Sequence, residues 1–409
     1  MSPIHITNPK VLIWARESAG LSLEVAALES SISDKYLTAI ERGKIVATRL
    51  QLTALSKVYH RPMYCLYLSE PPPLGQAIVN PRMQVTAWNM QDSQDVEILI
   101  RDLLARHQLL KIAIEHRKAS TIHSFIGSLS PHVGAATLAK SLVEYLGFDR
   151  FHLRNTQSLE SSFLLIRQRL ESIGVAVMIS GHVAFHHAIM PTRLYGSFSV
   201  IDAVLPLISI NENLSMANWI FAMIHELAHL FIADSGLSNL GWNDSNEKVI
   251  DQLCDDAASE FLLPSAELER LNIRDLATSS SIERLTEVAN QLRVSPQRLA
   301  SRLLEVALLP EPIWRDVEVR LQESRRQHFR VNRLDVHQKL HANSDLDVRC
   351  LRLGEVILNV TRDGLSSRAI SLTEAGQLLG IQPRKVQALL THTYVSNTSS
   401  GTPTRCDQH

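Results

Sequence analysis

The spacing of apolar residues predicts that the chain is mostly helical. Residues 95–117 repeat apolar side chains at intervals of three and four, the pattern of an amphipathic helix. Residues 216–232 form a longer apolar run without Gly or Pro, and residues 247–263 form a mixed run that stops before Pro264. We therefore expect a buried helix at 216–232 and a second, more polar helix that ends at Pro264.

Short apolar runs between these helices predict strands. The runs are 175–179, 197–200 and 207–210, and each is bounded by polar or turn-forming residues. A helix at 163–173, capped by Gly174, precedes the first of them. The expected fold class is mainly α with a small β-sheet (α+β).

Residues 1–70 have the pattern of a compact unit of five helices. Two short helices surround a tight turn, with Ser22 and Ser33 as N-caps and Gly43 after the second helix. Residues 71–75, Pro-Pro-Pro-Leu-Gly, form a stiff spacer that no helix tolerates. The unit is therefore expected to fold separately from the rest of the chain.

His225, Glu226 and His229 stand inside the apolar helix predicted at 216–232. Positions i and i+4 share one face of a helix, so both imidazoles point to one place. Two imidazole nitrogens are half of a zinc site, and a glutamate beside the first histidine can take a proton from a water activated by the metal. A buried helix rarely carries these side chains unless something pairs them, so the motif H-E-x-x-H indicates a metallopeptidase.

A catalytic zinc site needs a third protein ligand. Asp251 and Asp255 lie one turn apart on the inward face of the second helix, where an acid needs a partner such as a metal. The spacing alone leaves a second interpretation open, because both acids could instead cap the preceding loop or pair with a surface base. The other acids of that helix are expected to face water: Glu247, Asp256 and Glu260.

Four spaced motifs carry a family resemblance. They are Ile173-Gly174-Val175, Pro206-Leu-Ile-Ser-Ile-Asn211, His225-Glu-Leu-Ala-His229 and Val249-Ile-Asp-Gln-Leu-Cys-Asp-Asp-Ala-Ala-Ser-Glu-Phe-Leu-Leu-Pro264. Together they resemble the ImmA/IrrE-type zinc peptidase domain, whose substrate is usually a transcriptional repressor in a stress, phage or mobile-element response. The resemblance implies a zincin-like domain that holds one Zn²⁺ per chain on His225, His229 and Asp251, with Glu226 as the catalytic base.

The chain departs from that family at two positions of the second helix. Asp251 stands where the family has Glu, and its side chain is one methylene shorter. Asp255 stands where the family has Asn, which adds a negative charge near the metal. Asp255 is therefore a candidate partner for one of the two histidines.

A second resemblance covers residues 8–69. The motifs Ala15-Arg16-Glu17, Gly20-Leu-Ser22, Ile32-Ser33 and Ile40-Glu41-Arg42-Gly43 resemble the Cro/CI-like (XRE) helix-turn-helix domain. The resemblance implies a homodimer on a double-stranded DNA operator, with the second helix of the motif in the major groove. The residues implied to face DNA are Ser33, Asp34, Lys35, Tyr36, Thr38, Arg42, Lys44 and Arg49.

The charge of residues 1–70 leaves an alternative open. Eight Lys/Arg against six Asp/Glu is only mildly basic, and Asp34 repels phosphate. The unit could instead be a protein-docking module.

Composition and cysteine usage indicate which cellular compartment and which kind of zinc ligand to expect. The chain has 409 residues, of which 45% are hydrophobic and 20% charged, with a net charge of −1. It has no apolar run long enough to span a membrane and no signal-peptide pattern, so we expect a cytoplasmic protein without a membrane partner. The four cysteines show no C-x-x-C spacing, which argues for reduced thiols and against a cysteine-ligated zinc.

Some patterns are weaker. Residues 282–303 and 371–390 each read as helix, turn, helix; we interpret the first as structural, and the second as either a packing unit or a further DNA contact. Tyr195 could steady an oxyanion. Three histidines could approach the cleft, although loop histidines are more often solvated: His182, His186 and His187.

The patterns divide the chain into six predicted segments. They are the helix-turn-helix domain (1–70), a linker (71–84), a helical connecting region (85–157), the peptidase domain (158–309), a C-terminal helical region (310–390) and a disordered tail (391–409).

Two functions fit this organisation. The first is a DNA-binding regulator that cleaves a repressor or another regulatory protein. The second is a non-proteolytic autorepressor or antitoxin that binds its operator and a cognate toxin, with the zinc domain as sensor or docking module. Glu226 favours the enzyme, because a structural zinc site needs no general base and is usually closed by four ligands.

Overall fold

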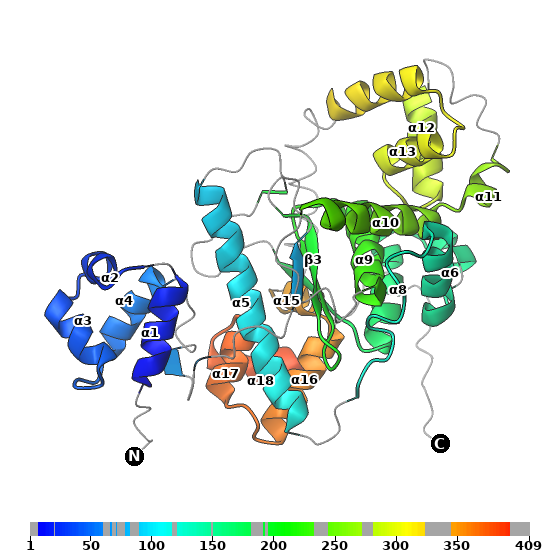
Figure 1. The fold of residues 1–409 in the computed structure, drawn as a ribbon. Helices are drawn as coiled ribbons and strands as arrows, with labels where there is room; N and C mark the ends of the chain where they lie inside the picture. The colour runs from blue at the N-terminus through cyan, green and yellow to red at the C-terminus, as the bar shows by residue number, and fades with distance from the viewer. Residues whose placement is uncertain are drawn as a thin grey trace, which may run out of the picture. The chain divides into compact units, whose positions relative to one another are not determined.

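The fold is mostly helical with a small sheet, which confirms the predicted class (Figure 1). It comes from a computed structural model that describes residues 7–19, 21–59, 66–67, 71, 78–81, 90–116, 121–148, 150–180, 191–192, 195–232, 244–271, 281–323 and 345–392. Most of the predicted spacer at 71–75 and nearly all of the predicted tail lie outside these residues. No helix within them is both long and apolar enough to cross a bilayer.

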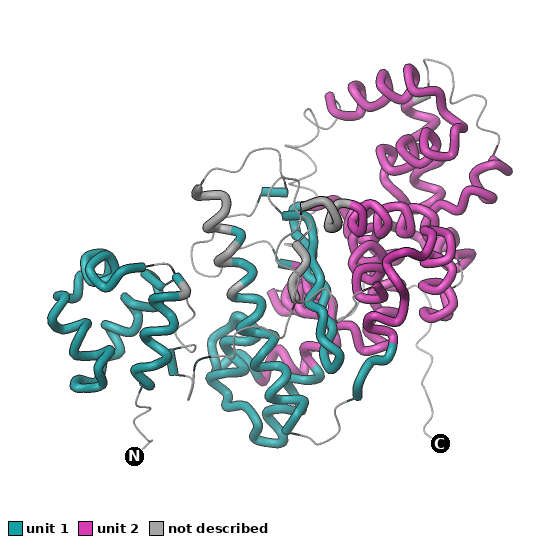
Figure 2. Tube along the Cα trace, viewed as in Figure 1, with its two compact units in different colours: residues 1–124, 180–213, 359–386 teal, residues 125–179, 214–358, 387–409 magenta. Residues whose placement is uncertain are grey.

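The chain forms two compact units, and each is assembled from separate stretches of sequence (Figure 2). Unit 1 contains residues 1–124, 180–213 and 359–386, and unit 2 contains residues 125–179, 214–358 and 387–409. The division into six segments stays a prediction.

Unit 1 begins with four helices within residues 7–19 and 21–59. The fifth helix expected in residues 1–70 stays a prediction, because the structure describes only residues 66 and 67 of the segment 60–70. Asn8, Ser22 and Thr48 cap three of the four helices through their side chains, as N-cap residues do. Ser33 takes the cap position of the remaining helix without a side-chain cap bond. The four are α1 (Pro9–Ser18), α2 (Leu23–Ser30), α3 (Asp34–Glu41) and α4 (Arg49–Val58).

A buried ion pair joins the first and third helices. Arg16 Nε donates to Glu41 Oε1 at 2.8 Å, and Arg16 Nη2 donates to Glu41 Oε2 at 3.0 Å. The hydrogen bond to Glu41 raises the pKa of Arg16, while burial and the Glu41 carboxylate raise the pKa of Tyr59, whose hydroxyl lies 3.4 Å from Glu41 Oε1. Leu37 and Leu55 belong to the buried apolar core of the same four helices, which also includes Tyr59.

The rest of unit 1 contains a long helix and a small sheet. α5 begins five residues before and ends two before the predicted 95–117. Lys111 holds α5 to the loop after β3, because its Nζ donates to Asp202 Oδ2 at 2.8 Å. β3 pairs antiparallel with both β1 and β4. The elements are α5 (Met90–Glu115), β1 (Ile78–Pro81), β3 (Ser197–Ile201), β4 (Leu207–Asn211) and α17 (Leu372–Leu378).

Unit 2 surrounds one apolar helix, α9, which has the bounds predicted from its apolar run. α8 and α10 pack on α9, and α6 packs on both α9 and α10; Figure 1 shows α10 crossing α9. α10 begins three residues earlier than predicted and ends before Pro264. The helices are α6 (Ala135–Leu146), α7 (Arg150–Arg154), α8 (Leu159–Ser172), α9 (Met216–Ile232), α10 (Asp244–Leu262), α11 (Ser265–Leu268), α12 (Ser281–Gln291), α13 (Pro296–Glu305) and α15 (Asp345–Leu353).

Two further elements, β2 (Ala176–Ser180) and α16 (Glu355–Ser366), begin in unit 2 and continue into unit 1. Arg167 of α8 is buried, and its guanidinium donates to the carbonyls of Val177 in β2 and Leu351 in α15. Gly354 follows α15 with φ +80°, and a Cβ there would lie 2.8 Å from the Val177 carbonyl oxygen. Only glycine accepts both the backbone angle and the close approach. α8 is thereby held where it supports α9.

The buried pair in the four-helix unit yields a test of the fold. In Glu41→Gln, Arg16 keeps its charge but loses the carboxylate of its partner. Breaking a buried pair in this way lowers the free energy of unfolding by about 3 kcal/mol. Hydrogen exchange of peptides from residues 9–58 in the full chain should accelerate about 100-fold.

Glu17→Gln is the matched control. Glu17 also lies near Arg16, at 3.7 Å, but its side chain is 65% exposed, so exchange should change less than about fivefold. Equal effects of the two substitutions would contradict the importance of the buried pair.

Candidate metal centre

Two buried imidazoles face each other on α9. The Nε2 atoms of His225 and His229 lie 3.1 Å apart, and the rings are 0% and 4% exposed. The i, i+4 spacing places both rings on one face, as the sequence predicts. Both imidazoles are removed from water at this separation. Their ring nitrogens therefore need a shared cation or hydrogen-bond partners, because burying an unpartnered polar group costs free energy.

Asp251 of α10 supplies a carboxylate to the same place. Its Oδ1 lies 3.2 Å from His225 Nε2 and 3.6 Å from His229 Nε2. Burial by itself would raise the pKa of Asp251, but the hydrogen bonds with both histidines hold that pKa well below its usual range. The side chain of Asp251 is 44% exposed, so this corner of the cluster is open to solvent.

The geometry of the three side chains fits a tetrahedral metal ion. Their ligand atoms all lie within 4.8 Å of one another. Ligands about 2.0–2.1 Å from zinc in a tetrahedron are about 3.3 Å apart, close to the three separations of 3.1, 3.2 and 3.6 Å. Two imidazoles and one carboxylate are also a donor set typical of catalytic zinc, and it leaves the fourth position for a small molecule.

Asp255 stands behind one of the histidines. Its Oδ1 lies 2.9 Å from His225 Nδ1, on the side of the ring away from Nε2. A carboxylate there favours the tautomer with the proton on Nδ1, which leaves the Nε2 lone pair directed at the metal position. The two acids of α10 therefore have different places, one beside the metal position and one behind it.

Glu226 follows His225 on α9 and is completely buried. Its position in the sequence next to the first histidine is the one that a general base takes in H-E-x-x-H sites.

Arg298 of α13 is a neighbour of the site that the sequence did not indicate. Its guanidinium carbon lies 3.6 Å from the centre of the Phe221 ring, and Phe221 lies one turn before His225 on α9. The ring centres of Phe221 and His225 are 6.2 Å apart. No spacing signal could have found this contact, because α13 reads only as an amphipathic helix.

The residues predicted to face DNA lie on the surface of the four-helix unit. Thr38 is half-buried, and its hydroxyl donates to the Asp34 carbonyl at 2.8 Å. The others are exposed and lie just before α3, on it, just after it or at the start of α4: Ser33, Asp34, Lys35, Tyr36, Arg42, Lys44 and Arg49. Their contact with DNA stays a prediction.

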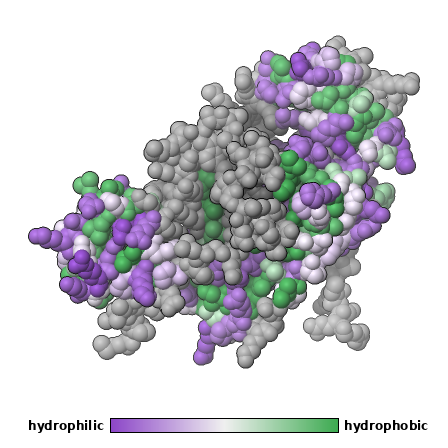
Figure 3. All heavy atoms as spheres, in the orientation of Figure 1, coloured by the Kyte–Doolittle hydropathy of each residue, from purple (hydrophilic) through white to green (hydrophobic). Residues whose placement is uncertain are grey.

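The same unit also exposes apolar side chains. Leu28 is 82% exposed and Leu50 is 84% exposed. Figure 3 shows hydrophobic residues interspersed among hydrophilic ones on this unit. A surface of this kind fits contact with a protein as well as contact with a nucleic acid.

The remaining site candidates lie elsewhere. Tyr195 is buried in unit 1, where its hydroxyl lies 2.9 Å from Ser209 Oγ and 3.2 Å from Ser180 Oγ, so it is engaged within the fold. The three loop histidines lie outside the described residues: His182, His186 and His187.

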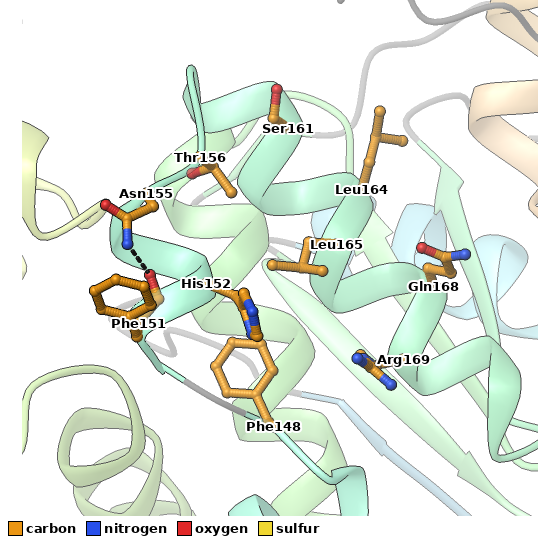
Figure 4. A pocket seen from close by; sticks show the side chains of 10 residues that line it. All are labelled: Phe148, Phe151, His152, Asn155, Thr156, Ser161, Leu164, Leu165, Gln168 and Arg169. Carbon is orange, nitrogen blue, oxygen red and sulfur yellow. Dashed lines mark hydrogen bonds between the residues drawn. The ribbon is translucent and has the colours of Figure 1, made fainter. Parts of the chain in front are cut away.

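A separate depression of about 550 Å³ lies on unit 2 against α7 and α8 (Figure 4). Phe148 and Leu165 form part of its apolar wall, and His152 and Arg169 add nitrogen atoms. None of its lining residues belongs to the metal cluster.

Comparison with known proteins identifies one family. Residues 180–304 match the family model of the IrrE N-terminal-like domain, Peptidase_M78, and this stretch includes the three clustered ligands and Glu226. No curated protein and no solved structure matches the chain. The central part of the chain is therefore similar to a metallopeptidase family, in agreement with the resemblance seen in its motifs.

Proposed function

We propose that the chain is a zinc-dependent peptidase that cleaves a regulatory protein and binds operator DNA. The observation that carries the proposal is the cluster of His225, His229 and Asp251, which offers a metal three ligand atoms within 4.8 Å of one another. One Zn²⁺ per chain would be held by these residues. The similarity of residues 180–304 to Peptidase_M78 supports the same reaction class.

Zinc at this position would supply a Lewis acid that polarises the scissile carbonyl and makes water a better nucleophile. Glu226 would accept the proton of the attacking water and then deliver it to the leaving amine. Burial of Glu226 keeps its carboxylate away from competing bulk water. Asp255 would hold the His225 ring in orientation through Nδ1.

The four-helix unit would bring the peptidase to DNA. Lys35, Arg42 and Lys44 are exposed on or just after α3, where cations would meet phosphates. Operator binding by a homodimer would place the enzyme near the genes controlled by its substrate, most simply a repressor. We expect this to occur in the cytoplasm.

The exposed Leu28 and Leu50 support a second candidate function. Apolar side chains at this exposure fit the docking of a protein such as a cognate toxin, with the chain acting as a non-proteolytic autorepressor. The two functions differ in whether Glu226 is needed.

The proposed zinc site predicts a metal content that depends on three side chains. Elemental analysis of the purified chain should find about one zinc per chain, and His229→Ala and Asp251→Ala should each lose it, because two remaining ligands bind zinc weakly.

Asp256→Ala is the control on the same helix, since Asp256 accepts from Gln252 and lies outside the cluster. It should retain zinc. Full zinc content in Asp251→Ala, with helicity unchanged by circular dichroism, would contradict the ligand set.

Asp255→Asn should weaken zinc binding about 10- to 100-fold while leaving about one site per chain. The substitution replaces the carboxylate that supports His225 with a neutral amide, but it removes no metal ligand. Competition with a chromophoric chelator measures this affinity directly. An affinity equal to that of the unmodified chain would show that Asp255 does not position His225.

Glu226→Gln distinguishes the two functions. It should retain zinc and operator binding but abolish cleavage and induction of the controlled genes, because only proton transfer is lost. A reporter assay compares it with Lys35→Ala, which should weaken operator binding and should derepress the controlled genes only if the chain is itself the repressor. Normal induction in Glu226→Gln would leave the non-proteolytic autorepressor as the explanation.

A further inference from the structure

α17 and α18 (Pro383–Thr391) form a compact helix-turn-helix near the end of the chain. Ser371 and Glu374 make a capping box at the start of α17, in which the Ser371 N–H donates to Glu374 Oε2 at 2.6 Å. A turn of residues 379–382 then leads into α18. Two short helices joined by a turn of three or four residues are the arrangement that double-stranded DNA-binding proteins use.

Two glycines make the turn tight. Gly380 has φ +67°, a backbone angle that other residues rarely adopt. A Cβ on Gly376 would lie 2.9 Å from the Ile381 carbonyl oxygen and 3.1 Å from Pro383 N, so the start of α18 presses directly against α17. The two helices therefore meet backbone against backbone at the turn.

One helix of the pair is anchored and the other carries a solvent face. α17 packs on α5, and the preceding α16 approaches α5 so closely that a Cβ on Gly364 would lie 2.7 Å from Ala113 Cβ. α18 buries Val386 on one side. The residues at its start are exposed: Gln382, Pro383, Arg384 and Lys385.

The charge of this face is suited to a polyanion. Glu374 is the sole acid in residues 371–392, and its carboxylate is engaged in the α17 cap. Arg384 Nε donates to the neutral Gln382 Oε1 at 2.8 Å, so its charge is not neutralised by that contact. By comparison, α3 begins with Asp34, which repels phosphate. The first turn of α18 is thus the more favourable of the two for DNA.

We propose that α17 and α18 are a second DNA-binding element, which places the start of α18 in the major groove of a duplex. Arg384 and Lys385 each neutralise a phosphate, and Gln382 orients the Arg384 guanidinium. The element acts independently of the peptidase and of the four-helix unit. This proposal can therefore fail while the proposed function holds, and the reverse is also true.

The test measures binding of the full chain to a fluorescent 30-base-pair duplex of mixed sequence between 50 and 200 mM salt. Each phosphate contact contributes about −0.9 to the slope of log K against log salt. Arg384→Gln/Lys385→Gln should therefore make the slope shallower by about 1.8 and weaken binding at least tenfold at 100 mM salt. The conservative variant Arg384→Lys/Lys385→Arg should retain the slope.

Two matched pairs control the experiment. Lys140→Gln/Arg169→Gln removes the same charge from exposed residues of α6 and α8 and should change binding less than twofold. Lys35→Gln/Arg42→Gln measures the contribution of the four-helix unit to DNA binding separately. The proposal is overturned if the unmodified chain binds no duplex or if the double variant in α18 binds as tightly as the unmodified chain. It is also overturned if the double variant in α6 and α8 loses as much affinity as the one in α18.

Discussion

The burial of two imidazoles on one apolar helix is the constraint on which the site depends. α9 must be apolar to form the centre of unit 2, yet it carries His225 and His229 at 0% and 4% exposure. Desolvated imidazole nitrogens cost free energy unless they meet a partner. α10 supplies that partner, because its carboxylates lie 2.9 to 3.6 Å from the ring nitrogens. A metal ion at the centre would satisfy the same groups more completely than hydrogen bonds can.

The packing around α9 keeps that geometry in place. α10 lies against both α6 and α9, so the carboxylate of Asp251 is carried by a helix held on two sides. α8 supports another side of α9, and Arg167 fixes α8 to the backbone of β2 and α15. A site built on packed helices is more rigid than one on loops, as metal coordination requires.

Much of the site follows from sequence patterns because it lies on regular helices. An apolar run without Gly or Pro predicts α9 with its observed bounds, and the i, i+4 rule then brings His225 and His229 together. The period of α10 likewise places Asp251 and Asp255 on one face. The Phe221–Arg298 contact could not be predicted, because it joins α9 to α13 through tertiary packing. The assembly of each unit from separate stretches of sequence could not be predicted for the same reason. Local periodicity carries no information on which distant segments of the chain meet.

On this proposal, α9 and α10 together form a mononuclear zinc site with nitrogen and oxygen ligands. X-ray absorption at the zinc edge of the purified chain tests it most directly. We predict two imidazole nitrogens and additional oxygen or nitrogen ligands at about 2.0–2.1 Å, with no sulfur. A sulfur shell at about 2.3 Å, or a spectrum unchanged by Asp251→Ala, would contradict it.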